Sequence, residues 1–338
     1  MSLLGLDAGI DGVTALVVDE DGDVLATGHH PFASHAAGPG RVELAPDEVW
    51  RAMLEATRAV LARVDPTALR GVGLSGASDV LVLWDRETLG APRPALAADD
   101  RRAESAQMDH RLAWLARHEP RTWAAVASGV YAVGGPAAYL VARLTRGTWH
   151  VTDVAAAARS GLGDLDTGTW SGARCAGAGL PVDVLPEPVP TWGVLDHTDA
   201  RSFCGLELPI AGLAAAAPAT LVGRGGGRPG DATHVAAEGT LLVLTDPAAD
   251  PTAGTSATAP AGALRPTLAW RAPDGSLTRA LTASVSGEEV ADVLAAVPGA
   301  TLRTPGAHDA ARGAAYLAGL GTGVWSSPAG VPGAAWPD

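Results

Sequence analysis

Short apolar runs alternate with glycine and aspartate turns at the start of the chain. Residues 3–6 and 13–18 form two such runs, and the turn between them contains Gly9 and Gly12. A third run follows the aspartate-rich turn at 19–23. Runs of this length, bounded by turn residues, are typical of β-strands that pair with their neighbours in sequence. The beginning of the chain therefore predicts a β-meander.

A helical pattern and two further apolar runs follow. Pro46 suits the first turn of a helix, and the two acidic residues after it favour the positive end of the helix dipole. Residues 42–63 then place four apolar side chains on one face at helical spacing: Val49, Met53, Ala56 and Val60. Residues 69–74 and 80–84 are predicted to be buried strands. This order of elements indicates an α/β domain with a mixed sheet.

The last third of the chain is richer in glycine, alanine and proline. The segment 286–297 predicts one capped helix, and 310–320 predicts a helix of small residues that packs closely against its neighbours. Residues 246–266 are expected to form a mobile loop. The glycine-rich run 223–231 is not followed by a helical pattern, so we interpret it as a plain turn, with contact to a phosphate as the weaker alternative.

Length and composition narrow the possible functions. A chain of 338 residues has room for two domains, and 47% hydrophobic residues allow a sizeable core. The net charge of −13 argues against nucleic acid and against an anionic membrane surface as partners, because both require a basic footprint. All 24 basic residues are arginines. Lysine chemistry, including a Schiff base or a P-loop lysine, is therefore excluded for this chain.

Cysteine and histidine give little support for a metal centre. Cys175 and Cys204 lie far apart, without partners at ligand spacing, so neither a disulfide framework nor a zinc site is expected. His29 and His30 would point to opposite faces of a strand, and with His35 they are interpreted as solvated, with a metal site as the weaker alternative. No signal-peptide pattern or membrane-spanning apolar run is visible, which predicts a cytoplasmic protein.

Asp7 is the first candidate for a functional side chain. It lies at the end of the first predicted strand, beside the turn that contains Gly9. Backbone N–H groups in such a turn could face a phosphate or a hydrated metal ion. An aspartate followed by a glycine turn also commonly does no more than cap that turn. The residues alone leave both interpretations open.

The order of several segments is similar to that of the FGGY carbohydrate kinases, the family of glycerol kinase and xylulokinase. The segments that carry the resemblance in the first half are LGLDAGIDGVTALVVD, PGRVELAPDEVW, GVGLSGASDVLVLWDRETLGAP and ALAADDRR. Those in the second half are GGPAAYLVARLTRG, HVTDVAAAARSGLGDLDTGTW, LPIAGLAAAAPATLVGRGGGRPGDATHVAAEGT, LTASVSG and RGAAYLAGLGTGVW. PAAYLVARLTRG and TDVAAAARS resemble xylulokinase more than glycerol kinase. The resemblance covers most of the chain.

This resemblance implies an α/β fold of the ribonuclease-H-like or actin-like type. It implies a first domain at 1–207 and a shortened second domain at 208–338. In the family, ATP binds against the second domain and a sugar or polyol lies in the cleft. Phosphoryl transfer there requires a metal such as Mg²⁺, donors that hold the phosphates, and a carboxylate that accepts the proton of the substrate hydroxyl.

The phosphate and substrate positions depart from the family pattern. Asp7 matches the acid that in the family contacts the metal through water, and Gly9 matches the turn glycine. Ile10, however, stands where the family has a hydroxyl residue, and Asp11 adds a negative charge. Asp7 and Gly9 are therefore interpreted as a vestigial phosphate or Mg²⁺ site. The substrate-gripping cluster of the glycerol kinase branch falls on 77–79 here.

The resemblance leaves a small set of candidate substrate-binding residues. In the 77–79 cluster only Asp79 keeps a carboxylate. The segment from Asp99 to Arg102 keeps acids and arginines, so Asp100 and Arg101 are candidates for hydroxyl recognition. A capped, charged start of a helix is an equally good interpretation of that segment.

The departures in the second half concern catalysis. By the family alignment Ala216 replaces the aspartate that acts as general base, and a methyl group cannot accept a proton. Glu238 stands where a phosphate-binding hydroxyl is expected. The adenosine loop that the family carries between the segments matched by LTASVSG and RGAAYLAGL is missing. We therefore favour impaired or absent phosphoryl transfer, with no cofactor assigned unless the protein is active with ATP and Mg²⁺.

Three hypotheses remain on the sequence alone. The first is a family member that keeps a cleft for a small sugar or polyol, or a regulatory role, without kinase activity. The second is an active sugar or polyol kinase that uses Asp79 or Asp100 as a relocated base. The third is a structural subunit that pairs with a full-length kinase. A homo-oligomer is also expected, because the shortened second domain should leave an apolar surface uncovered.

Overall fold

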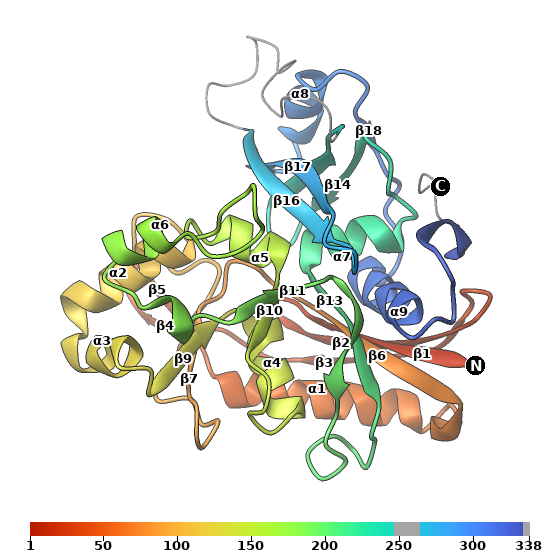
Figure 1. The fold of residues 1–338 in the computed structure, drawn as a ribbon, viewed down its shortest axis with the longest axis horizontal. Helices are drawn as coiled ribbons and strands as arrows, with labels where there is room; N and C mark the ends of the chain where they lie inside the picture. Colours follow the sequence, from red (N-terminus) through yellow and green to blue (C-terminus); the bar gives the residue numbers. More distant parts are fainter. Residues whose placement is uncertain (247–263, 334–338) are drawn as a thin grey trace.

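A computed structural model gives the fold and describes residues 1–246 and 264–333. The predicted meander forms one edge of a six-stranded sheet in the order β12-β13-β6-β1-β2-β3 (Figure 1). Its strands are β1 (Ser2–Ala8), β2 (Gly12–Asp19), β3 (Val24–Pro31), β6 (Leu69–Gly76), β12 (Trp192–His197) and β13 (Pro209–Ala215). β1, β6 and β13 run parallel, whereas β2, β3 and β12 run antiparallel to their neighbours. The mixed sheet predicted from the strand and helix order is confirmed.

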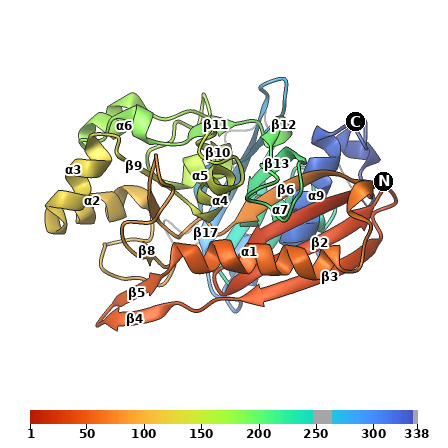
Figure 2. The ribbon, with the colours of Figure 1, turned by 90° about the horizontal axis from the view of Figure 1, so that it is seen from below.

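Alternation along the strands divides the core of this sheet into two layers. Leu4 and Leu6 face the cluster that includes α1 (Pro46–Leu61), whereas Leu3 and Leu16 face the cluster of α7 (Ala216–Gly223) and α9 (Asp309–Gly321). Neighbouring residues of a strand point to opposite faces, so one run of leucines serves both layers. Figure 2 shows α1 across one side of the sheet and α9 beyond it.

Glycines bring α9 very close to the sheet. A β-carbon at Gly5 would lie 1.9 Å from the carbonyl oxygen of Ala311, and one at Gly73 would lie 1.9 Å from that of Ala314. Only glycine permits such a close approach between a strand and a helix backbone. The close packing predicted for the small-residue helix is therefore confirmed.

A second, five-stranded sheet stands above the first, in the order β16-β17-β15-β14-β18 (Figure 1). Its strands are β14 (Asp231–Val235), β15 (Thr240–Leu244), β16 (Arg265–Arg271), β17 (Leu277–Ser284) and β18 (Thr301–Leu302). α8 (Val290–Ala295) packs on one side of this sheet with Val290 and Val293. The two sheets with their helices are called the first and second lobes below.

Shorter elements complete the first lobe. Three small sheets consist of β4 (His35–Gly38) with β5 (Arg41–Leu44) and β8 (Ala95–Leu96), β7 (Val82–Asp85) with β9 (Tyr131–Gly134), and β10 (Val151–Asp153) with β11 (Glu187–Val189). The other helices are α2 (Met108–His118), α3 (Pro120–Ala127), α4 (Pro136–Leu144), α5 (Val154–Arg159) and α6 (Gly172–Gly177), with 3₁₀ turns at Pro66–Ala68, Val182–Val184 and Pro328–Gly330. α5 packs against β16 and so joins the two lobes.

Several boundaries differ from the sequence-based expectation. The helix predicted at 42–63 begins only at Pro46, because the residues before it pair as β5. The strand predicted at 80–84 belongs to the small sheet of β7 and β9. The helix predicted at 286–297 is limited to α8, since Ser286 and Glu289 form a hydrogen-bonded turn ahead of it.

Further expectations concern the segments between elements. The run 223–231 leads from α7 directly into β14, so the expectation that no helix follows it is confirmed. Most of the loop expected at 246–266 lies outside the described residues, but Arg265 and Pro266 already belong to β16. The boundary between 207 and 208 stays a prediction, and the strand just beyond it, β13, is hydrogen-bonded into the first sheet. Within 1–246 and 264–333, no helix is both long and apolar enough to cross a membrane.

Candidate functional site

Asp7 lies where the first two parallel strands end. Its strand partner is Ser75 on β6, and the Ser75 hydroxyl donates a hydrogen bond of 2.7 Å to Asp7 Oδ1. Burial raises the pKa of Asp7, and the bond from Ser75 opposes that rise. The N–H of Gly9 donates to the carbonyl of Gly12 at 3.0 Å, so this amide closes the turn and does not face the cleft as a free donor. The vestigial phosphate role of these residues stays a prediction.

Asp79 forms an ion pair at the junction of the lobes. It follows β6, and both of its carboxylate oxygens accept hydrogen bonds of 3.0 Å from Nη2 of Arg159 at the end of α5. Nη1 of Arg159 donates at 3.0 Å to Oγ1 of Thr282 on β17. The side chains of Arg159 and Asp79 are 14% and 19% exposed, so the pair is largely removed from water. One arginine therefore holds a first-lobe acid and a second-lobe hydroxyl together.

Glu238 brings a further carboxyl group to this junction. It lies in the turn between β14 and β15, and its Oε2 atom is buried without a hydrogen-bond partner in the described structure. Burial, together with the negative charges of Asp79 and Asp7, raises the pKa of Glu238 to about 8, although Arg159 opposes the rise. A carboxyl group in this setting is mostly protonated at neutral pH.

The expected base position is apolar. Ala216 is the first residue of α7 and is 3% exposed. A carboxylate does lie beside it: Asp153 receives the backbone N–H groups of Ala155 and Ala156 at 2.9 and 3.0 Å and so caps α5. Burial raises the pKa of Asp153 to about 6, and the backbone amide of Ala215 is among the groups that oppose this rise. Asp153 thus stabilises a helix start next to the place where an acid was expected.

The structure gives Asp100 and Arg101 local roles. Asp100 accepts the backbone N–H of Val42 at 2.8 Å and pairs with Arg102 at 2.8 Å. Burial would raise the pKa of Asp100, but the hydrogen bonds from Arg102 and Val42 lower it overall. Arg101 is exposed, and its backbone N–H donates to the carbonyl of Gly40. This segment is not the start of a helix, because α2 begins only at Met108.

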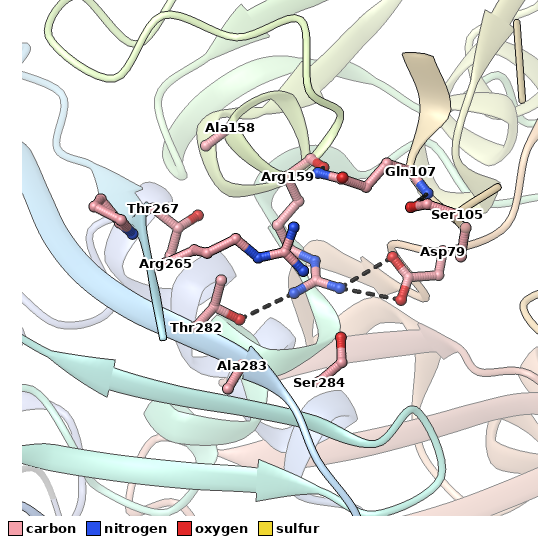
Figure 3. Close-up of a pocket in the computed structure, with 12 residues that line it drawn as sticks. Asp79, Ser105, Gln107, Ala158, Arg159, Arg265, Thr267, Thr282, Ala283 and Ser284 are labelled. Atoms are coloured by element: carbon pink, nitrogen blue, oxygen red, sulfur yellow. Dashed lines mark hydrogen bonds and ion pairs between the residues drawn. The ribbon is translucent and has the colours of Figure 1, made fainter. Parts of the chain in front are cut away.

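Two cavities open beside the ion pair of Asp79 and Arg159. The larger, of about 160 Å³, lies between α5 and the strands β16 and β17 (Figure 3). The smaller, of about 30 Å³, lies under α5 and also touches Asp153. Asp79, Gln107 and Arg159 line both. Carboxylate, amide, guanidinium and hydroxyl groups around one hollow are the groups that hold a molecule with several hydroxyls.

Other candidate residues do not join this site. Nδ1 of His29 lies 3.2 Å from Oγ1 of Thr14, and His35 lies 4.0 Å from Glu48. Across the described ranges, no group of three or more His, Cys, Asp or Glu residues is arranged to hold a metal ion. Cys175 and Cys204 are free thiols.

Sequence reasoning missed several residues of the junction. It did not single out Arg159, Thr282 or Arg265, which line the larger cavity. A signal was present in the strands, because polar residues alternate at 265 and 267 and again at 282 and 284. Only the pairing of those strands shows that the two alternations share one face.

Comparisons with known proteins agree with the resemblance seen in the sequence. Residues 2–110 and 105–223 match the model of the FGGY family of carbohydrate kinases, N-terminal domain. The chain is 31% identical over 295 residues to the glycerol kinase of Aromatoleum aromaticum, covering 80% of this chain and 58% of that protein. It is 31% identical over 248 residues to the glycerol kinase of Verminephrobacter eiseniae, covering 66% and 48%. The chain thus spans only about half the length of these relatives.

Solved structures show the same fold. Glycerol kinase of Plasmodium falciparum with ADP superposes with a TM-score of 0.71 at 19% identity, covering 87% of this chain and 63% of that chain. Xylulose kinase of Rhodospirillum rubrum superposes with a TM-score of 0.70 at 23% identity, covering 86% and 62%. The actin-like α/β fold predicted from the resemblance is confirmed.

Proposed function

Because this chain belongs to the FGGY family of carbohydrate kinases, we propose that it binds a sugar or polyol at the junction of its lobes without transferring a phosphoryl group. The observation that carries the proposal is the buried methyl group of Ala216 at the expected base position. General-base catalysis contributes about 10²–10⁴-fold to a rate. The neighbouring acid, Asp153, already accepts two backbone N–H groups and caps a helix, so it is poorly suited to replace the base.

The residues at the junction do not suit the phosphates of a nucleotide. Ile10 offers no hydrogen-bond donor, and Gly9 uses its N–H within its own turn. Glu238 places a buried carboxyl group where a hydroxyl is expected to meet phosphate. The charges of Asp7 and Asp79 already act on Glu238, and further negative charge would be repelled. We therefore assign no catalytic step that involves ATP or Mg²⁺.

The cavities favour a neutral or weakly charged hydroxylated ligand. The pair of Asp79 and Arg159 presents charged acceptors and donors side by side, and charge-assisted hydrogen bonds of this kind orient hydroxyl groups. Gln107 adds an amide at the rim. A polyol held there would contact both lobes, since Arg159 also reaches Thr282.

Two measurements on the full chain test the proposal. Calorimetric titration with glycerol, xylulose and sorbitol is expected to detect binding of at least one of them, and a coupled assay for ADP with the same compounds and Mg-ATP is expected to show no turnover above the rate without sugar. Asp79→Asn should abolish the binding, whereas Asp183→Asn, at an exposed position, should leave it unchanged. Sugar-dependent formation of ADP would contradict the proposal.

A second candidate function is phosphoryl transfer with Glu238 as the proton acceptor. The observation that favours it is the pKa of Glu238, raised by burial to about 8, because a base works best when its pKa is near the operating pH. If the chain is an active kinase of this kind, Glu238→Gln should remove the sugar-dependent ADP signal, and Glu289→Gln should not. If the sugar-dependent ADP signal persists in both variants, Glu238 is excluded as the base.

Pairing with another chain remains a third proposal. Large hydrophobic side chains with at least 40% exposure in the described ranges are Met1, Val24, Leu25, Val130, Val182, Val194 and Leu302. Val24 and Leu25 adjoin on the edge strand β3, whereas Leu302 lies on β18 of the second lobe. Sedimentation of the chain alone, and again with a full-length glycerol kinase, tests the expected homo-oligomer and the expected complex. A single monomeric species in both experiments would reject both.

A further inference from the structure

One wall of the larger cavity is a polar face of the second sheet. Arg265 on β16 is the cross-strand partner of Thr282 on β17. Thr267 and Ser284 lie two residues further along their strands and therefore point to the same side. All four side chains line the cavity opposite α5 (Figure 3). The second sheet thus presents one guanidinium and three hydroxyls toward the first lobe.

This wall carries an uncompensated positive charge. Figure 3 shows the Arg265 side chain extending toward Arg159. Arg159 is neutralised by Asp79, with Nη2 to Oδ1 at 3.0 Å. No ion pair joins Arg265 to an acid anywhere in the described ranges, although the chain as a whole has a net charge of −13. Two guanidinium groups that share a cavity repel each other unless an anion lies between them.

Two donors of residues that line the cavity also lack partners in the described structure. Nε of Arg159 and Oγ1 of Thr267 are buried and have no hydrogen-bond partner in the described structure. Thr282, in contrast, is fully used, since its hydroxyl accepts from Arg159 and donates to the carbonyl of Leu241 at 3.0 Å. Buried donors without partners are costly, so an acceptor placed next to them would offset that cost.

We infer that the larger cavity binds a sugar acid, with its carboxylate between Arg265 and Arg159 and its hydroxyls toward Thr267, Ser284 and Gln107. This inference rests on the proposed function, since it names the class of ligand for the same junction. Asp79 neutralises Arg159 and leaves the single positive charge of Arg265, which a monoanion would neutralise. A dianionic phosphate would instead place excess negative charge beside Asp79, which lines the same cavity.

Gluconate and sorbitol form a matched pair of probes, because they share a hydroxylated six-carbon chain and differ at one end in the carboxylate. Calorimetry on the full chain at low salt is expected to give gluconate about tenfold tighter binding than sorbitol, the size of one hydrogen-bonded charge. The preference should shrink as salt is added. Arg265→Gln should lower gluconate binding to the sorbitol level and leave sorbitol unchanged, whereas Arg121→Gln, at an exposed position on α3, should change neither.

The outcomes separate this inference from the proposed function. Equal binding of the two probes, or a preference that survives in Arg265→Gln, would overturn the sugar-acid assignment while leaving polyol binding intact. Binding of inorganic phosphate with gluconate inert would overturn it as well. Gluconate-dependent ADP formation would reject the proposed lack of catalysis but support the ligand class. Because Arg265 is exposed, its variant should keep the urea midpoint of the unmodified chain, which a denaturation curve checks.

Discussion

The contact of α9 with the first sheet and the junction between the lobes are both buried, but they are built from opposite materials. At α9, glycines let backbone meet backbone, and all partners are apolar or small. At the junction, Arg159, Asp79 and Glu238 meet in a setting with unpartnered buried atoms. The first contact is optimised for packing density, whereas the second keeps polar groups available at a cost in stability. This difference is the reason why we propose the ligand site at the junction.

The largest effect is expected at the helix contact. Gly73→Ala places a methyl group 1.9 Å from the carbonyl oxygen of Ala314, so β6 and α9 must separate. Overpacking against a backbone that cannot yield should cost about 3 kcal/mol or more in the free energy of unfolding, measured by urea denaturation. Gly172→Ala is the control, because nothing lies within 4 Å of a β-carbon there. Equal stability of the two variants would show that the helix contact tolerates expansion.

The next effect is a pH dependence at the junction. Burial raises the pKa of Glu238 to about 8, so the folded protein holds a proton that the unfolded chain has already lost above its usual pKa. The contribution of the Glu238 carboxyl group to the free energy of unfolding is therefore fully present below its unfolded-state pKa. It is lost as pH rises toward about 8. Glu238→Gln mimics the protonated form. From pH 5 to pH 8, the free energy of unfolding of this variant should rise relative to that of the unmodified chain by on the order of 1–3 kcal/mol.

Glu289→Gln provides the control for that titration. A hydrogen bond from the Ser286 backbone lowers the pKa of Glu289. Replacing Glu289 should therefore change the pH dependence of stability only at more acidic pH. Urea denaturation of the three proteins at several pH values measures the differences. A gain that is the same at pH 5 and pH 8 would mean that Glu238 does not titrate in this window.

A smaller effect is expected from the ion pair of Arg159 and Asp79 at the junction. Arg159→Gln removes the Nη2 group that donates to both carboxylate oxygens of Asp79 in a largely buried place. Because both side chains retain some exposure, the loss should be about 1–2 kcal/mol rather than that of a fully buried pair. The exposed pair of Arg279 and Asp166 offers the comparison, and Arg279→Gln should cost about 0.5 kcal/mol or less. If both variants lose the same free energy of unfolding, the ion pair at the junction is no more stabilising than the exposed pair.

The smallest effect belongs to the start of α8. Ser286→Ala removes the hydroxyl that donates to Glu289 Oε2 at 2.7 Å. The turn should lose about 0.5–1 kcal/mol, the usual range for a weakened helix start. Hydrogen exchange of the α8 amides resolves so local a change. Unchanged protection there would show that the packing of Val290 and Val293, and not the turn, holds the helix.

Local patterns predicted the meander, the strand at β6 and the two helices α1 and α9, because periodicity and capping are contained within each segment. They did not predict where a strand would pair. β13 follows the expected domain boundary yet pairs with β6 inside the first sheet, and no nearby residue signals this. The strand expected at 80–84 likewise leaves the main sheet for β9.

The site was predictable to a lesser degree. Asp7, Asp79 and Glu238 were found through their positions relative to the family, and the structure brings them within electrostatic reach of one another. Arg159 lies in an alanine-rich segment, and its partner Thr282 follows 123 residues later, so their contact is invisible in the sequence. The role of Asp100 in hydroxyl recognition stays a prediction, since an acid beside arginines can equally well fasten a loop.

The packing of α9 on the first sheet also has a consequence for folding during synthesis. Ala311 and Ala314 press on Gly5 and Gly73, which leave the ribosome long before them. Until α9 emerges, the leucine face of β1 and β2 lacks its cover and is open to association with other nascent chains. Completion of the first lobe must therefore wait until the segment that forms α9 has been synthesised, and contacts between residues so far apart in sequence favour slow folding.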